Sequence, residues 1–109
     1  MKIKTFNSLT IQACKLLGEM IQYERKNKSW TKKELAERLN ISHVTLNRLE
    51  DGDLSCAIGF YFEAATLLGI SLFAMDKNPL YYQLQNIEEK NTLLPKRIRK
   101  KPSGVDDDF

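Results

Sequence analysis

Hydrophobic side chains recur every three or four residues along most of the chain, which is the spacing of one face of an α-helix. The first such pattern covers residues 9–25, and its apolar positions are Ala13, Leu16, Leu17, Met20 and Ile21. No segment alternates between apolar and polar residues as a half-buried strand does, apart from a weak candidate at residues 2–6. The pattern therefore predicts an all-α protein.

Two short helices are predicted in the middle of the chain. Thr31 is a good N-cap, and Glu34 three residues later completes a capping box for a helix that runs through Leu39. Asn40 tolerates the positive φ of a tight turn. Ser42 can then cap a second helix.

The second helix is expected from His43 to about Asp51, with Gly52 closing it. Two helices joined by three residues must cross steeply and share a buried seam. The residues available for the seam are apolar or small, and they are Leu35, Ala36, Leu39, Ile41, Leu46 and Leu49. These offsets suit a helix-turn-helix.

Further helices are predicted towards the C-terminus. Ser55 is a candidate cap for a fourth helix that Gly69 ends, with Ile58, Phe60, Phe62, Ala64, Ala65, Leu67 and Leu68 along it. Residues 71–75 suggest one more short helical turn. Asn78 and Pro79 fit the N-cap and first position of a helix that continues to about Lys90, with Leu80, Leu84 and Ile87 on one face.

Composition changes sharply after Leu94. A basic, proline-flanked stretch at 95–102 and an acidic end at 106–109 contain too little apolar surface to fold alone. We therefore expect an N-terminal segment at 1–8, a helix-turn-helix domain at 9–77, an additional helix at 78–94 and a flexible tail at 95–109.

Overall composition excludes several classes of protein. The 109 residues, 42% of them hydrophobic and 28% charged, allow one compact domain and a tail. No apolar run approaches the roughly 18 residues of a membrane span, and Met1 to Lys4 do not resemble a signal peptide. We expect a cytoplasmic protein, from a bacterium. The net charge of +3 is compatible with nucleic acid without requiring it.

Candidate chemistry is sparse. With two cysteines and one histidine, no set of about four zinc ligands at short spacing exists, and we expect no cofactor and no metal. Cys14 and Cys56 are interpreted as small buried apolar residues rather than as a disulfide. No nucleophile–base pair or phosphate-binding glycine loop is present. We expect that the chain is not an enzyme.

The stretch from Thr31 to Gly52, TKKELAERLNISHVTLNRLEDG, resembles the Cro/Xre helix-turn-helix of phage repressors and bacterial regulators. The resemblance covers roughly residues 13–72 and implies a five-helix, lambda-repressor-like domain. Its ending, Leu49 to Gly52, is especially similar. Asn40 departs from the pattern, because the family usually has glycine there.

The resemblance implies a role for each matching position. The groove-facing side of the recognition helix would contact double-stranded DNA bases through His43, Val44, Thr45, Asn47 and Arg48. Their chemistry agrees: arginine pairs with guanine, asparagine with a base edge or phosphate, and valine with a thymine methyl group. Thr31 and Lys32 would contact phosphate through backbone N–H groups, hydroxyl and ammonium. Arg25 and Glu50 match a pair that bridges the first and third helices.

Single residues leave alternatives open. His43 is either a DNA contact at the helix start or an idle surface histidine, and no second ligand or nucleophile is placed near it. Exposure of Val44 is unexplained without a partner. The aromatic run from Phe60 to Phe62 fits core and dimer contact better than base stacking.

A second resemblance lies in the C-terminal third. The segments at 67–69, 78–80, 94–99 and 106–109 are similar to those of HipB-type antitoxins, the Xre-type regulators that accompany HipA-like kinase toxins. It implies a homodimer that represses its own type II toxin–antitoxin operon and restrains a kinase. The alternatives are a helix-turn-helix protein-interaction module and a stand-alone phage-type regulator with no toxin partner.

The tail has two possible roles. Its basic residues form either a solubilising tail or an arm for phosphate or a partner, and they are Lys96, Arg97, Arg99, Lys100 and Lys101. Phe109, beside three aspartates, is either a docking anchor or a frayed end.

Overall fold

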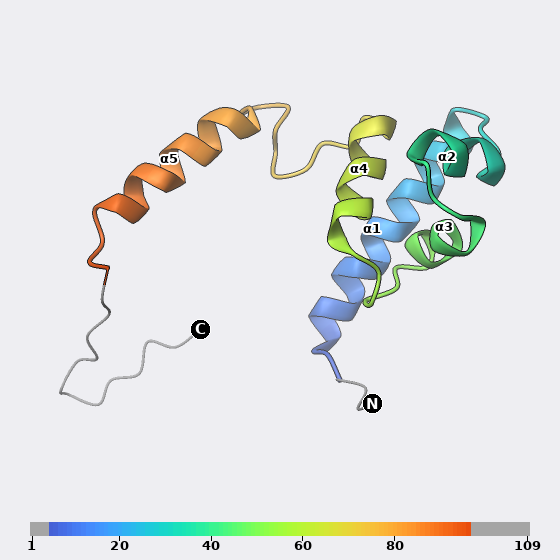
Figure 1. Ribbon diagram of the computed structural model, residues 1–109, viewed down its shortest axis with the longest axis horizontal. Coiled ribbons are helices and arrows are strands. Elements are labelled where there is room, and N and C mark those ends of the chain that lie inside the picture. The colour runs from blue at the N-terminus through green and yellow to red at the C-terminus, as the bar shows by residue number, and fades with distance from the viewer. Residues whose placement is uncertain (1–4, 97–109) are drawn as a thin grey trace. The chain divides into compact units, whose positions relative to one another are not determined.

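The computed structural model describes residues 5–96, and helices are the only regular elements within that range. The prediction of an all-α fold is therefore confirmed for the described part of the chain. The helices are α1 (Ser8–Asn27), α2 (Lys32–Leu39), α3 (His43–Glu50), α4 (Ile58–Leu68) and α5 (Leu80–Thr92) (Figure 1). The chain divides into two compact units, the first ending at Leu72 and the second beginning at Phe73.

The first unit is built around contacts of α1 and α2 with α3 and α4. Its predicted seam is confirmed, because Leu35, Ala36, Leu46 and Leu49 are buried. Leu39 and Ile41 pack at the edge of the same core. The other buried hydrophobic residues are Ile21, Tyr61, Ala64, Ala65, Leu68 and Ile70.

The buried face of α1 differs from the predicted stripe. Gly18, Ile21 and Arg25 are the buried residues of this helix, whereas Leu16 and Met20 are exposed. The stripe holds at Ile21 and at Leu17, which packs against the core, and fails at Ala13, Leu16 and Met20. The inward face also includes a glycine and an arginine, which an apolar pattern cannot select. α3 packs where Gly18 leaves room for its backbone.

Four helices end in the same way, with one residue in the left-handed region. After that residue, the next N–H donates to a carbonyl five residues back, which satisfies the helix end. The left-handed residues are Ser29, Asn40, Gly52 and Gly69, with φ of 60°, 56°, 74° and 76°. The corresponding N–H to O distances, from Trp30, Ile41, Asp53 and Ile70, are 3.1, 3.0, 3.0 and 2.8 Å. The tight turn predicted at Asn40 is confirmed.

The predicted helix starts hold for α2 and α3 but fail for α4. Thr31 forms the full capping box with Glu34, and the Ser42 side chain accepts from the N–H of Thr45. The prediction that Ser55 caps α4 was wrong. This side chain turns back to Asp53, and α4 begins at Ile58 without a side-chain cap.

The second unit contains a turn followed by α5. The helical turn predicted at 71–75 is not formed, because Phe73 and Ala74 have φ of 55° and 52°, outside the right-handed helical region. The N-cap of α5 is Pro79, one residue later than predicted. The side-chain amide of Gln83 donates to the carbonyls of Phe73 and Asn78, at 2.8 and 2.6 Å, and so ties the turn to the helix.

In the first unit, α1 and the end of α3 approach backbone to backbone. A Cβ atom added at Gly18 would lie 2.7 Å from the Gly52 nitrogen and 2.8 Å from the carbonyl oxygens of Leu49 and Glu50. A Cβ atom at Gly52 would lie 2.6 Å from the Cα of Lys15. Neither backbone can shift as a flexible side chain would. Glycine is therefore required on both sides of this contact.

A buried ion pair joins the same two helices. The Arg25 Nε donates to Glu50 Oε2 at 2.6 Å, and Nη2 donates to Oε1 at 3.2 Å. Nη1 of Arg25 donates to the carbonyl of Trp30 at 3.0 Å. Because both side chains are more than nine-tenths buried, the forked geometry satisfies charges that would otherwise be costly to bury.

We expect alanine to have opposite effects at two helical glycines. Gly18→Ala should lower the free energy of unfolding by roughly 1–3 kcal/mol, because its Cβ meets backbone. Gly59→Ala, in α4, should raise it by about 0.5–1 kcal/mol, because nothing lies within 4 Å and alanine favours the helix. Urea denaturation of the two variants measures both. If Gly18→Ala does not lower the free energy of unfolding relative to Gly59→Ala, the close approach of the two backbones is contradicted.

The ion pair predicts a non-additive double-mutant cycle. Arg25→Met and Glu50→Leu should each cost about 3–5 kcal/mol, because each leaves a buried charge without its partner. The double variant should lose clearly less than the sum, since both charges are then gone. Denaturation of the four proteins measures the coupling, and strictly additive losses would refute it.

Candidate nucleic-acid interface

The short helix α3 has one face in the core and the other in solvent. Leu46, Leu49 and Glu50 are buried. On the other side, His43, Asn47 and Arg48 are exposed, Thr45 is half-buried, and Val44 is 67% exposed although it is apolar. All five side chains implied as base contacts thus lie outside the buried set.

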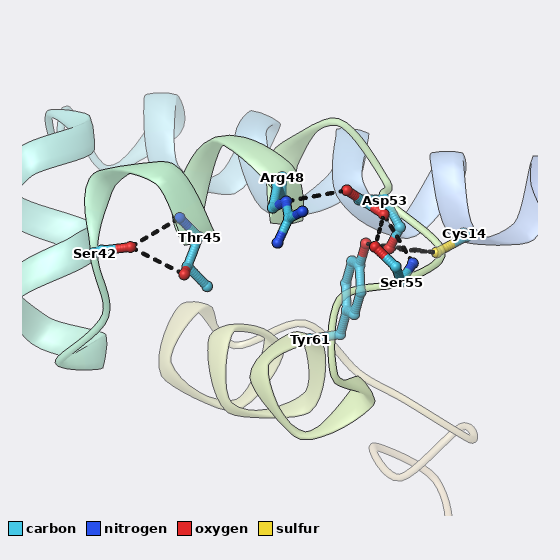
Figure 2. Close-up of polar contacts among 7 residues, drawn as sticks. All are labelled: Cys14, Ser42, Thr45, Arg48, Asp53, Ser55 and Tyr61. Carbon is cyan, nitrogen blue, oxygen red and sulfur yellow. Dashed lines mark hydrogen bonds and ion pairs between the residues drawn. The ribbon is translucent and has the colours of Figure 1, made fainter. Parts of the chain in front are cut away.

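Hydroxyl groups organise the start of α3. The Ser42 Oγ accepts from the Thr45 N–H at 3.1 Å and donates to the Thr45 Oγ1 at 3.0 Å (Figure 2). With its oxygen accepting this bond, the hydroxyl of Thr45 can still donate its own hydrogen. The cap therefore orients Thr45 as a donor at the N-terminal end of the helix.

Lys32 and Asn47 link α2 to α3 on the exposed side. The Lys32 Nζ donates to the Asn47 Oδ1 at 2.9 Å. Because an ammonium group only donates, it is the oxygen of the amide that faces Lys32. The amide NH₂ and the remaining N–H bonds of Lys32 are then neighbouring donors. Such a pair suits an acceptor, either a base edge or a phosphate oxygen.

Thr31 is already engaged at the start of α2. Its backbone N–H donates to the Glu34 carboxylate at 3.0 Å, and its Oγ1 accepts from the Glu34 N–H at 3.1 Å. The backbone hydrogen bond from Thr31 lowers the pKa of Glu34, which keeps this carboxylate ionised at neutral pH. A phosphate would therefore have to compete with Glu34 for the Thr31 N–H group.

Arg48 faces an acidic residue just beyond α3. Its Nε lies 3.4 Å from the Asp53 Oδ2. The Asp53 Oδ1 accepts two further hydrogen bonds, from the Ser55 N–H at 2.8 Å and the Ser55 hydroxyl at 2.7 Å. Hydrogen bonds from Ser55, its side chain first, and the charge of Arg48 lower the pKa of Asp53. The carboxylate is therefore ionised at neutral pH.

The backbone of Asp53 is held from the core. The Tyr61 hydroxyl, on α4, donates to the Asp53 carbonyl at 2.7 Å, and Figure 2 shows this ring reaching from α4 to the loop. The Cys14 thiol lies 3.5 Å from the Tyr61 oxygen and 3.8 Å from the same carbonyl. Burial raises the pKa of Tyr61, so the phenol stays protonated and donating.

The two cysteines differ from the expectation of small buried apolar residues. Both are free and only half-buried. Cys14 makes polar contacts, because its thiol is placed beside a carbonyl and a phenol. Burial raises the pKa of Cys56, which keeps that thiol in its neutral form.

Sequence reasoning missed the group formed by Asp53, Ser55, Tyr61 and Cys14. The Asp-x-Ser spacing is a local signal for a side-chain turn and could have indicated the Asp53–Ser55 contact. No local signal could have joined Tyr61 and Cys14 to this loop, because they come from other helices.

Within residues 5–96, no group of three or more potential ligands is arranged to hold a metal ion. No helix in that range is long and apolar enough to cross a membrane. Lys96 is the last described residue of the basic tail. Arg97, Arg99, Lys100, Lys101 and Phe109 lie outside the described residues.

Comparison with known proteins agrees with this geometry. Residues 21–73 match the helix-turn-helix family. A segment of 37 residues, 34% of this chain, is 49% identical to the HTH-type transcriptional regulator DicA of Escherichia coli (strain K12). That match covers about a quarter (27%) of the relative's length. No solved structure matches the chain significantly. Residues 21–73 therefore form a helix-turn-helix domain, and the fold of residues 5–96 is all-α and Cro/Xre-like.

Proposed function

We propose that this chain is a sequence-specific DNA-binding transcriptional regulator that places α3 in the major groove. One observation carries the proposal: an eight-residue helix, fixed by its buried face, presents hydrogen-bonding side chains and an exposed valine outward. An α-helix fits the major groove, where every base pair has a distinct pattern of donors, acceptors and methyl groups. The likeness to a transcriptional regulator supports the same role.

The proposal assigns a contact to each exposed side chain. Arg48 contacts guanine and Val44 a thymine methyl group. His43 and Thr45 lie at the N-terminal end of α3, which approaches the bases most closely in this docking mode. Asn47 contacts a base edge or a phosphate, and Lys32 a phosphate oxygen beside the groove. A regulator with these contacts is a binding protein rather than an enzyme.

We further propose that the protein acts as a homodimer and represses transcription. One recognition helix contacts only about half of an operator, so two-fold symmetry with half-sites about one helical turn apart provides the remaining contacts. The operator is then an inverted repeat.

The antitoxin of a kinase-toxin operon is a second candidate. The similarity of the C-terminal segments to HipB-type proteins favours it, including the basic residues from Lys96 onward. In this role the protein represses its own operon and restrains a HipA-like kinase. A stand-alone regulator would bind an operator but have no kinase partner. A protein-interaction module would bind a protein partner and have no operator.

Replacing Arg48 tests the docking of α3. Against an operator selected from random DNA with the wild-type protein, Arg48→Ala should weaken binding by roughly 1–3 kcal/mol and relax preference at one base pair of each half-site. Electrophoretic shift titrations with single-base operator variants measure both. Arg38→Ala removes the same charge from α2, where the guanidinium lies 4.2 Å from the Trp30 ring centre.

The control should lose affinity about equally for all sequences and keep the base preference. Equal preference in Arg48→Ala and wild type would contradict groove recognition by this helix. A wild-type protein that selects no sequence would favour the interaction module instead.

Removing residues 95–109 separates the two candidates. An antitoxin should keep its operator affinity within about threefold and lose capture of the kinase encoded beside it, because the tail then serves the protein partner. A phosphate-contacting arm predicts the reverse, with weaker DNA binding and a shallower dependence on salt. Co-purification with the neighbouring kinase and salt-dependent titrations distinguish these results, and retention of the kinase by the truncated protein would count against a tail-mediated antitoxin.

A further inference from the structure

The two carboxylate oxygens of Asp53 have different partners. Oδ1 accepts both hydrogen bonds from Ser55, and Oδ2 lies 3.4 Å from the Nε of Arg48. Figure 2 shows the carboxylate between the two side chains, at the end of α3. One oxygen therefore holds the acid in place while the other faces the arginine.

The position of Asp53 is also tied to the core. Its carbonyl accepts from the hydroxyl of Tyr61, which is 3% exposed, and its N–H donates to the carbonyl of Arg48 at 3.0 Å. The residue before it, Gly52, packs against the backbone of α1. The backbone of Asp53 is thus fixed by its own hydrogen bond to α3 and by contacts of this loop with α1 and α4.

We propose that Asp53 is a positioning residue for base recognition: it holds the Arg48 guanidinium by its Nε, so that the two terminal nitrogens face a guanine. This inference rests on the proposed function. A guanidinium has five N–H bonds in a planar fork, and guanine presents two acceptors, O6 and N7, in the major groove. With the carboxylate beside Nε as an ion pair at 3.4 Å, the edge formed by the two terminal nitrogens is the one left for the base.

The benefit is orientation rather than stability. The Arg48 side chain is 58% exposed and that of Asp53 is 30% exposed, so this ion pair contributes little to folding. Arginine loses considerable side-chain entropy when it is immobilised. A carboxylate that restricts the arginine side chain before binding lowers the entropy cost of binding. The restricted orientation favours guanine, because only a base with two suitably spaced acceptors gains both hydrogen bonds. Asp53 therefore increases discrimination more than affinity.

The test compares Asp53→Asn with Asp51→Asn. Asp53→Asn keeps an oxygen for Ser55 but replaces the oxygen facing Arg48 with an NH₂ group, which has no negative charge to attract the guanidinium and cannot accept a hydrogen bond. Asp51→Asn removes the same charge two residues away, from an exposed residue at the end of α3. Both variants lose one negative charge near DNA, so any general gain in affinity should be shared.

The measured quantity is the ratio of affinities for the selected operator and for the operator with the Arg48-dependent guanine replaced. We expect this ratio to fall roughly three- to tenfold in Asp53→Asn and to stay unchanged in Asp51→Asn. In an Arg48→Ala background, Asp53→Asn should change it no further. Circular dichroism and thermal melting check that the variants remain folded.

The outcomes separate this inference from the proposed function. If Arg48→Ala loses the guanine preference while Asp53→Asn keeps it, the proposed function stands and the positioning role is refuted. An equal loss in both asparagine variants would also refute it, because charge alone would then explain the effect. If the wild type has no guanine preference, the proposed docking of Arg48 fails and this inference with it.

Ser55→Ala provides a second variant that leaves the charge in place. The substitution removes the hydroxyl contact to Oδ1 and leaves only the contact from the backbone N–H of residue 55. The carboxylate is then held less firmly beside Arg48, so the ratio should fall in the same direction but by less. If Asp53→Asn does not fold, an unchanged ratio in Ser55→Ala overturns the inference.

Discussion

The approach of two backbones at Gly18 and Gly52 sets the geometry of the first unit. Because a methyl group on either side would meet main-chain atoms at less than 3 Å, the end of α3 can lie against α1 only at this place. The buried ion pair of Arg25 with Glu50 fastens the same helices two turns further along α1. The other end of α3 is positioned by the turn at Asn40, so both ends of a very short helix are fixed.

Such fixing matters because an eight-residue helix is marginal in isolation. The inward residues of α3 pack in the core, and its outward residues contribute almost nothing to the core. Net charge does not explain an affinity for DNA, because residues 31–51 contain equal numbers of basic and acidic side chains. The four basic residues are Lys32, Lys33, Arg38 and Arg48, and the four acidic residues are Glu34, Glu37, Glu50 and Asp51. Affinity for an anionic polymer must then depend on where individual groups are held rather than on a general basic patch.

The local features of this domain were predictable, and the long-range ones were not. The capping box at Thr31 and the turn at Asn40 depend on residues a few positions apart, and the structure has both. The seam through Leu35 and Leu49 was predictable because the helix-turn-helix motif fixes the offsets of its apolar positions, and both residues are buried. The start of α4 was misplaced because Ser55 has a competing partner in Asp53. For α1, the inward face could be identified only with α3 in view.

The same distinction applies to the candidate interface. Residues on α2 and α3 could be selected from motif positions, but the contacts among them depend on side-chain geometry. Neither the hydrogen bond from Lys32 to Asn47 nor the carboxylate beside Arg48 follows from spacing. They indicate that the side chains predicted to contact DNA are partly organised before any DNA is present.

The hydrogen bond from Tyr61 to the carbonyl of Asp53 has a consequence for how substitutions on the exposed face of α3 could change its binding preference. It fixes the backbone of Asp53, and so keeps an acidic residue at the end of α3, whatever residue occupies position 48. If α3 contacts DNA as proposed, an uncharged replacement of Arg48 would leave that acid unpaired near the phosphates, which would lower affinity for every sequence. New target preferences are therefore expected to arise through paired exchanges at positions 48 and 53, while the tyrosine and the two close-packed glycines stay unchanged.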